Sequence, residues 1–419
     1  MASPVIQSGD YLLEMDTGFS SFGFVLDDPV EGVLDNPTYV LDGLGVWADI
    51  TPYTVQVAYS RGREKTDFQF GAGTMTFLMR DETGILGPYD TTSPYYDTAN
   101  DQPGLAPMRP VRLSRQGEYL FVGVVTSYYY EFQMAGPNIV NVVCADEFYK
   151  LAQTNMDAYN PTPQTSGQRI TSVLALPEVD YSGSSSIATG TVNLGHSTAY
   201  DVPGGTNTLT YLQQVNQAEQ GRLFVARDGT ITFQERIGNT LSGPVISFTD
   251  DGTGAPYVDI QVEFDADNVV NRSYVEALNG SIGTDSDAGS IAEYFIQNVS
   301  ITNSLLDSQS EIDALATYLL VPDPEPRYTS VTTYFANLTS GQRNTVATID
   351  IGDTISIHKD IPGLGSAIAS ELSVEGIRGV IDVQRGHTIT YYTAPTTIVY
   401  ELILNDATYG IIDSTNVLG

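Results

Sequence analysis

The strongest constraint on the fold is a period-two alternation of apolar and polar side chains between residues 53 and 149. Four runs follow it, separated by Gly, Pro and Asp: YTVQVAY (53–59), TMTFLMR (74–80), YLFVGVVTSYYYEF (119–132) and IVNVVCA (139–145). Because successive side chains of a strand point to opposite faces, the pattern predicts short strands. The segment 84–110 between them is rich in Pro, Gly, Asp and Tyr, and we expect a long loop there that makes functional contacts.

Consecutive tyrosines mark one of these strands. Tyr128, Tyr129 and Tyr130 place aromatic rings on both of its faces. A covered second face implies a neighbouring domain or subunit. These three residues are therefore candidate subunit contacts, as are Tyr95 and Tyr96 of the long loop. The alternative is an ordinary core with one amphipathic tyrosine at the surface.

In residues 145–243 the sequence pattern is no longer that of strands alone, and it predicts three helices. DEFYKLAQ opens with acids that suit a helix N-terminus, and SGQRITSVLAL offers Ser166 as the N-cap of a second helix. Apolar side chains recur at helical spacing over 209–215, and Gly221 is predicted to supply the left-handed residue that ends this third helix.

A hairpin is predicted to follow directly. RLFVAR and TITFQER flank Asp228 and Gly229, and an Asp-Gly pair accepts the positive φ of a tight turn. Together with the preceding helix, this hairpin forms a compact module without an evident nucleophile, metal ligand or phosphate loop.

Strands return between residues 246 and 419. Eight runs carry the pattern: VDIQVEF, NRSYVEAL, YTSVTTYF, TVATIDI, TISIH, SVEGIRGVIDV, HTITYY and TIVYELIL. One helix is marked by Ser308 and Glu311, which have capping-box spacing, and Pro322 ends it. The chain is therefore predicted to be mainly β with α+β elements, divided into an N-terminal arm or loop (1–47), a β region (48–150), an α/β insert (151–245) and a second β region with one packed helix (246–419).

The excess of acidic over basic residues argues against some classes of function. The chain has 51 Asp and Glu against 18 Lys and Arg, a formal net charge of −33. Such a protein repels phosphate, which disfavours DNA binding through a basic groove. Cys144 is the single cysteine, so neither an intrachain disulfide nor a four-cysteine metal site can form.

Catalytic signatures do not emerge from the sequence. His196, His358 and His387 are its three histidines, and HExxH, GxSxG and Walker motifs do not occur. The stretch DSDAG (285–289) resembles a calcium loop but lacks the acid at the twelfth position, so we interpret it as a polar turn. Carboxylates are abundant, and a glycosidase pair drawn from them stays open as an alternative. We predict no catalytic, cofactor or metal site.

The stretch RGREK (61–65) is the one local basic cluster, with Gly62 at its predicted turn. A nucleic-acid contact is conceivable. In so acidic a chain, we expect these bases to pair with carboxylates of a neighbouring strand or subunit.

Several stretches together resemble hub-type minor tail proteins of long-tailed phages, in the order of that family and over roughly residues 48–405. They are ITPYTVQVAYSRGREKTDFQFGAGTMTFLMRDETGILGP, PMRPVRLSRQGEYLFVGVVTSYYYEF, YLQQVNQAEQGRLFVARDGTITFQER, DADNVVNRSYVEA, ATYLLVPDPEPRY and IDIGDTISI. The resemblance implies two tube-like β-barrel domains per chain, joined by the α/β helix-hairpin insert. This insert would act as a wedge on the outside of a ring of chains and position the second barrel against the first.

The resemblance also implies partners and a location. Three copies would form a ring at the tail tip of a virion assembled in the host cytoplasm, and so present six barrels to a sixfold tail tube. The expected partners are the chain itself as a homotrimer, the distal tail or tail tube protein, the tape measure protein, tip or fibre proteins, and viral DNA only in transit. An acidic channel would let DNA slide through. The alternatives are a receptor-binding module that uses loop 84–110 and a cell-wall glycan hydrolase.

Overall fold

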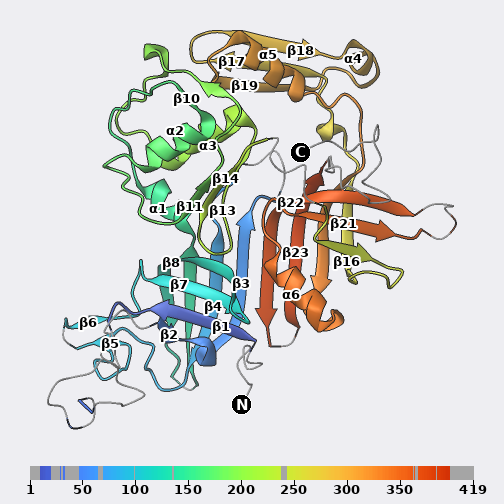
Figure 1. Ribbon diagram of the computed structural model, residues 1–419. Coiled ribbons are helices and arrows are strands. Elements are labelled where there is room, and N and C mark those ends of the chain that lie inside the picture. Colours follow the sequence, from blue (N-terminus) through green and yellow to red (C-terminus); the bar gives the residue numbers. More distant parts are fainter. Residues whose placement is uncertain are drawn as a thin grey trace, which may run out of the picture.

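The computed structural model describes residues 10–19, 29, 32–33, 47–64, 69–98, 100–134, 136–236, 243–361, 363, 367–383 and 385–396. In this part of the chain a large sheet forms the lower body of the molecule, and helices with smaller sheets form the upper body (Figure 1). The predicted strand TIVYELIL and most of the predicted arm 1–47 lie outside the described residues.

Thirteen strands of the described residues make the large sheet. Its path runs through β16 (Asp259–Glu263), β20 (Arg327–Tyr334), β23 (Gly386–Pro395), β22 (Ile368–Asp382), β3 (Thr54–Gly62), β4 (Thr74–Asp81), β9 (Asn138–Ala145), β8 (Glu118–Glu131), β7 (Pro110–Arg115), β1 (Tyr11–Asp16) and β2 (Trp47–Asp49). Off this path, β21 (Thr354–Lys359) pairs with β22 and with the parallel strand β15 (Ile246–Thr249). The mainly β fold class is confirmed.

The two β regions of the sequence meet inside this sheet. Strand β3 pairs antiparallel with β22, from Gln56 opposite Asp382 to Gly62 opposite Gly376. One hydrophobic core serves both regions, with members such as Val57, Phe77, Val142, Ile377 and Ile389. The regions expected to be separate barrels are thus continuous edge to edge within one chain.

Gly62 ends strand β3 and is not part of the turn predicted for it. Its φ is +81°, a conformation that L side chains rarely adopt. A Cβ at this position would lie 2.3 Å from the Glu375 carbonyl oxygen. The close approach of β22 therefore requires glycine here.

The upper body contains the insert and a second small unit that was not predicted to belong to it (Figure 1). The insert has α1 (Glu147–Gln153), α2 (Ser166–Leu174), α3 (Thr208–Glu219), the pair β10 (Gln164–Thr165) and β12 (Asn193–Leu194), and a sheet of β11 (Ser185–Ile187), β14 (Ile231–Gln234) and β13 (Arg222–Val225). The second unit has α4 (Ala288–Tyr294), α5 (Gln309–Tyr318) and a sheet of β18 (Ile282–Ser286), β17 (Arg272–Ala277) and β19 (Asn298–Ser304). Both units share one core, so a boundary at residue 245 does not separate the two bodies.

The N-cap of α2 was predicted one residue too late. Thr165 is the N-cap, and its backbone N–H donates to the Gln168 side chain at 3.1 Å. Ser166 is the first helical residue, and its hydroxyl donates to the buried Glu219 carboxylate at 2.7 Å. The reciprocal Thr-x-x-Gln spacing identifies the true cap.

The end of α3 also differs from the prediction. Gln220, with a φ of 56°, takes the left-handed position that was assigned to Gly221. Gly221 is needed for space, because its Cβ would lie 2.5 Å from the Gln234 carbonyl oxygen of the paired strand.

Two local predictions are confirmed. Strands β13 and β14 form the antiparallel hairpin around Asp228 and Gly229, and Gly229 has a φ of +88°. Ser308 is the N-cap of α5, and its hydroxyl accepts from the Glu311 backbone N–H and donates to the Glu311 carboxylate.

The run TVATIDI was wrongly predicted as a strand. It falls largely in α6 (Ser340–Thr348), where Thr339 and Gln342 form a capping box and Val346 and Ala347 enter the sheet core. Three helices, α4, α5 and α6, therefore occur after residue 246 in the described residues, where one was expected. No helix in the described ranges is long and apolar enough to cross a membrane.

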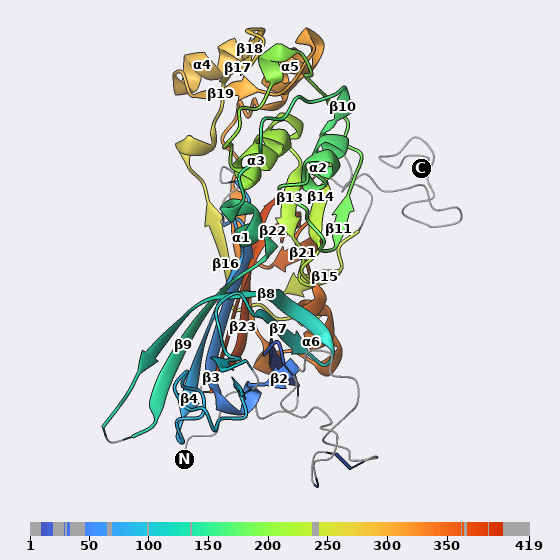
Figure 2. The ribbon, with the colours of Figure 1, turned by 90° about the vertical axis from the view of Figure 1, so that its left-hand side faces the viewer.

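Within its described residues, the predicted loop 84–110 contains the short strands β5 (Tyr96–Asp97) and β6 (Gln102–Pro103), and β7 begins at its last residue, Pro110. The neighbouring hairpin of β8 and β9 is much longer, and Figure 2 shows it projecting away from the rest of the sheet. We call the end of this hairpin, residues 127–141, the aromatic arm.

Candidate functional site

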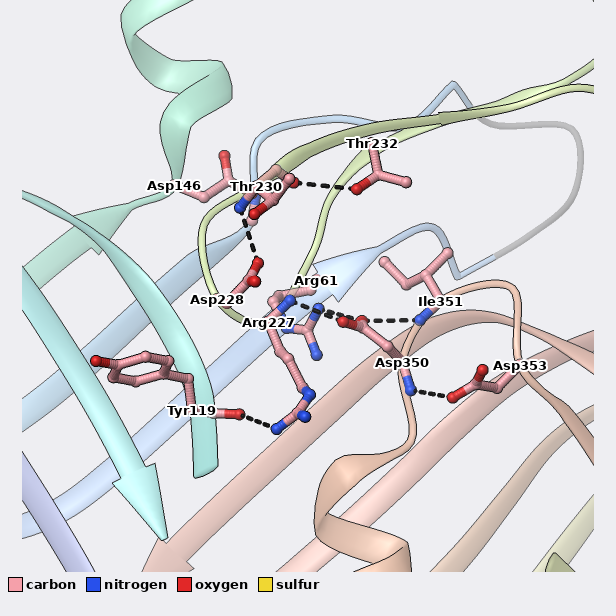
Figure 3. A network of polar contacts seen from close by, with 11 residues as sticks. Arg61, Tyr119, Asp146, Arg227, Asp228, Thr230, Thr232, Asp350, Ile351 and Asp353 are labelled. Atoms are coloured by element: carbon pink, nitrogen blue, oxygen red, sulfur yellow. Dashed lines mark hydrogen bonds and ion pairs between the residues drawn. The ribbon is translucent and has the colours of Figure 1, made fainter. Parts of the chain in front are cut away.

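The hairpin of β13 and β14 runs from the upper body to the large sheet (Figure 1), and Figure 3 shows the polar contacts around its tip. We call residues 222–234 the clamp hairpin. At its tip, the Ala226 N–H donates to the Thr230 carbonyl at 2.8 Å, and the Thr230 N–H donates to the Asp228 carboxylate at 3.0 Å. A Cβ on Gly229 would lie 3.1 Å from Val122 of β8, so the tip lies directly against the sheet.

Asp350 is the first anchor of the clamp hairpin. Its carboxylate accepts from Arg61 Nη1 at 2.6 Å and from the Arg227 backbone N–H at 2.8 Å (Figure 3). Arg227 also donates through Nη1 to Glu118 at 2.8 Å and to the Tyr119 carbonyl at 3.2 Å. Asp350 follows α6, Glu118 and Tyr119 begin β8, and Arg61 belongs to β3. The tip thus bridges segments from both β regions.

Glu375 of β22 is the second anchor. Glu375 is 2% exposed, and its carboxylate accepts from Arg63 at 3.0 and 2.7 Å and from Arg222 at 2.9 Å. The Ser373 hydroxyl donates to the same carboxylate at 3.2 Å and accepts from Arg222 at 2.8 Å. Two guanidinium groups and a hydroxyl therefore supply the hydrogen bonds that water would give to an exposed carboxylate. Arg61 and Arg63 of the basic cluster thus pair with carboxylates, as predicted.

Asp146 lies beside the first anchor, at the N-cap of α1. Its carboxylate accepts from the Gly73 N–H at 2.6 Å and from the Phe148 N–H at 3.0 Å. Burial raises the pKa of this carboxyl to about 7, although the two backbone donors and the Arg61 charge act in the opposite direction. The junction therefore contains one acid that titrates near neutral pH.

His387 is the buried histidine of the sheet core. Its Nδ1 lies 2.9 Å from the Tyr11 hydroxyl and its Nε2 lies 3.2 Å from the Tyr59 hydroxyl, while the Phe335 ring lies 4.1 Å from the imidazole. Burial, together with the Arg115 charge, lowers the pKa of His387 to about 3, so the ring is neutral. Neutral imidazole suits this environment because one nitrogen donates and the other accepts.

Three further polar features were considered as sites: the calcium-like stretch, clusters of metal ligands, and a hollow beside α2. Asp287 of the calcium-like stretch is the N-cap of α4 and accepts from the Ser290 N–H at 2.8 Å. No group of three or more His, Cys, Asp or Glu side chains in the described part of the chain could hold a metal ion. A hollow of about 400 Å³ beside α2 is lined by neutral groups such as Gln164, Gln168 and Thr171, and none of its lining residues is a carboxylic acid.

The aromatic arm carries a ladder of stacked rings. Tyr128 and Tyr130 stack at 6.0 Å, and Tyr130 and Phe132 stack at 5.9 Å. Tyr128 is held by its own chain through a hydroxyl contact of 2.9 Å to the Met15 sulfur, and burial raises the pKa of Tyr130 to about 12. Tyr129 and Phe132 are 62% and 60% exposed.

The two candidate tyrosines of the loop make different contacts. The Tyr95 ring packs edge-on against Tyr53 at 6.3 Å, and the Tyr96 hydroxyl donates to Asp101 at 2.9 Å. Of the five aromatic candidates, the structure therefore stacks Tyr128 and Tyr130 together and leaves Tyr129 the most exposed.

Asp350 and Glu375 were not singled out from the sequence. Arg61 lies 289 residues before Asp350, and Arg63 lies 312 residues before Glu375. The bases were visible as a local cluster, but no local signal chooses their partners among 51 acids.

Comparisons with known proteins identify the fold. No family model matches the chain, and no curated protein matches it. Among solved structures, the chain is similar to the tail protein from Neisseria meningitidis MC58, with a TM-score of 0.59, 12% identity, and coverage of 93% of this chain and 98% of that one. It is also similar to the 43 kDa tail protein of prophage MuSo2 from Shewanella oneidensis, with a TM-score of 0.56, 11% identity, and coverage of 92% and 98%. The chain has the fold of these phage tail proteins, in agreement with the resemblance read from the sequence.

Proposed function

We propose that the chain is a structural component of a phage tail, and that three copies form the hub at its distal end. The observation that carries this proposal is the similarity of fold over nearly the full length of two tail proteins. In this role the hub joins the tail tube to tip or fibre proteins, contacts the tape measure protein, and surrounds the channel through which DNA leaves. It performs no catalysis.

The clamp hairpin supports a mechanical role. Each half of the large sheet corresponds to one proposed tube-type unit, and the clamp hairpin binds both halves through Asp350, Glu118 and Glu375. The pair of Arg222 with buried Glu375 favours one orientation, because moving that half of the sheet would leave a buried charge without its partner. A hub whose two units keep a fixed angle can match a symmetric tail tube.

The edges of the sheet support assembly. Strands β16 and β2 end the path of the sheet within the described residues, and β16 carries exposed Val262, with exposed Phe264 directly after it. Open edges with apolar side chains favour pairing with another chain, and a closed ring removes such edges. The net charge of −33 suits a channel that must not retain DNA.

Light scattering on the purified protein tests the proposal. We expect a particle of three times 45.3 kDa, about 136 kDa. A species that stays at the mass of one chain at high concentration, and is absent from purified tails, contradicts the hub. Release of sugar products from host cell wall, lost on changing a single Asp or Glu, would instead favour the hydrolase.

Exposed Tyr89 of the loop 84–110 favours receptor binding as the second candidate function. Deleting the loop separates the two functions. If the chain is a receptor-binding module, tails with the deleted loop should assemble but should not adsorb to host cells. If the chain is the proposed hub, these tails should still adsorb, because other tip proteins bind the receptor.

A further inference from the structure

The turn between α4 and β19 holds a large aromatic residue in an unusual backbone conformation. Phe295 has φ 60° and ψ −179°, a region that is populated almost only by glycine. Its side chain is nevertheless 83% exposed, so ring burial does not compensate for this conformation. Ile296, which follows it, is also exposed.

A buried asparagine imposes the conformation. Asn271 is fully buried, and its Nδ2 donates to the Phe295 carbonyl at 2.7 Å while its Oδ1 accepts from the Gln297 N–H at 2.8 Å. The Asn271 backbone N–H donates to the Gln297 carbonyl at 3.0 Å. Ser290 completes the set, since its hydroxyl lies 3.2 Å from Asn271 Nδ2 and donates to the Pro322 carbonyl at 2.6 Å. The turn is fixed on both sides of Phe295, and the ring is held outward.

The surroundings of this ring are acidic. Residues 272–325 contain nine Asp and Glu and one basic residue, Arg272. The Tyr294 hydroxyl bonds to Glu293 and lies within reach of the Asp323 charge, so two of these carboxylates lie beside the turn. The unit is at the far end of the molecule from β1 and β2 (Figures 1 and 2).

We propose that Phe295 and Ile296 form a docking knob that inserts into an apolar socket rimmed by Lys and Arg on a different tail protein. Strain that persists in an exposed residue indicates a constraint from binding, and charge complementarity selects a basic partner. A second copy of this chain is a poor source of such a rim, because it has 18 Lys and Arg among 419 residues. This inference rests on the proposed function, since it assumes that the chain is assembled in a tail.

Photo-crosslinking in assembled tails tests the knob. Phe295→p-benzoylphenylalanine is placed in the full chain, tails are purified and irradiated, and the joined peptide is identified by mass spectrometry. We expect one other tail protein, joined at a peptide rich in Lys and Arg. The matched control carries the same group at Tyr318, an exposed aromatic position on α5 of the same unit, and should give at least tenfold less of that product.

Two results overturn the knob alone: the chain is present in tails but position 295 forms no product, or the product joins two copies of this chain. Absence of the chain from tails overturns the proposed function as well. On the purified protein, Phe295→Gly should raise the Tm and Phe295→Ala should not, because only glycine relieves the backbone. A lower Tm for Phe295→Gly than for Phe295→Ala contradicts the strain on which the knob depends.

Discussion

The clamp hairpin and the aromatic arm are both two-stranded hairpins that leave a sheet, yet their ends have opposite chemistry. The clamp hairpin ends in charged groups that are bound by its own chain, with Arg227 against Asp350 and Glu118. The aromatic arm ends in Tyr129, Phe132 and Met134, which are exposed. A charged tip with partners in its own chain stabilises the arrangement of the domains within that chain. An apolar tip that faces solvent favours contact with another molecule.

The largest stability effect is expected from breaking the second anchor of the clamp hairpin. Glu375→Gln leaves Arg63 and Arg222 facing a neutral group, and loss of one partner of a buried ion pair costs about 3–5 kcal/mol. The urea midpoint should fall accordingly. The control Glu118→Gln removes an exposed partner of Arg227 and should cost less than about 1 kcal/mol. Equal midpoints for the two variants would show that burial of the anchor does not matter.

The seam between the sheet halves should also be sensitive. Gly62→Ala adds a Cβ that would lie 2.3 Å from a β22 carbonyl, and it does so at a φ of +81°. Gly84→Ala has a similar φ of +87° but meets nothing within 4 Å. We expect the control to cost about 1 kcal/mol from the backbone alone, and Gly62→Ala to cost clearly more. If the two variants have the same free energy of unfolding in denaturant, the close packing of β3 on β22 is contradicted.

The pH dependence separates two buried groups. The pKa of His387 is lowered to about 3 in the folded state, so its contribution to stability is lost as pH falls from about 6.5 towards 3. The pKa of Asp146 is raised to about 7, so the folded state binds its proton first and gains stability as pH falls from about 7 towards 4.

Two variants reveal these opposite slopes, each at most about 1.4 kcal/mol per pH unit. The stability difference between the native protein and His387→Gln should shrink with acid, and the difference for Asp146→Asn should grow. Thermal unfolding at pH 7, 6, 5 and 4 measures both. If stability changes with pH in the same way in all three proteins, neither His387 nor Asp146 has a shifted pKa in the folded state.

The aromatic arm should show the smallest change in stability. Phe132→Ser at an exposed site is expected to alter the free energy of unfolding by about 0.5 kcal/mol or less. If the arm is a subunit contact, the fraction of trimer measured by sedimentation should nevertheless fall. Leu278→Ser, at another exposed apolar position, should leave the trimer unchanged. An unchanged trimer in both variants would remove the arm from the interface.

Strands were readily predicted from the sequence, while long-range relations were not. Predicted runs such as TMTFLMR and IVNVVCA match β4 and β9 to within one residue, because alternation is a local property of a half-buried strand. The run TVATIDI alternates as well, and only the capping pair Thr339 and Gln342 upstream identifies the helix.

The site was predictable only in part for the same reason. The Arg61 and Arg63 cluster was expected to meet carboxylates, but the choice of Asp350 and Glu375 depends on the pairing of β3 with β22. Likewise, nothing local indicates that β17, β19 and α5 pack on the core of the insert. Contacts across several hundred residues are set by the whole fold.

Imaging the purified protein by electron microscopy along its symmetry axis tests the central claim most directly. The account predicts three copies around one axis, with both sheet halves of each copy facing a common opening and the aromatic arms lying at contacts between copies. A single copy without a neighbour, or an assembly whose sheets face away from any shared axis, would contradict it.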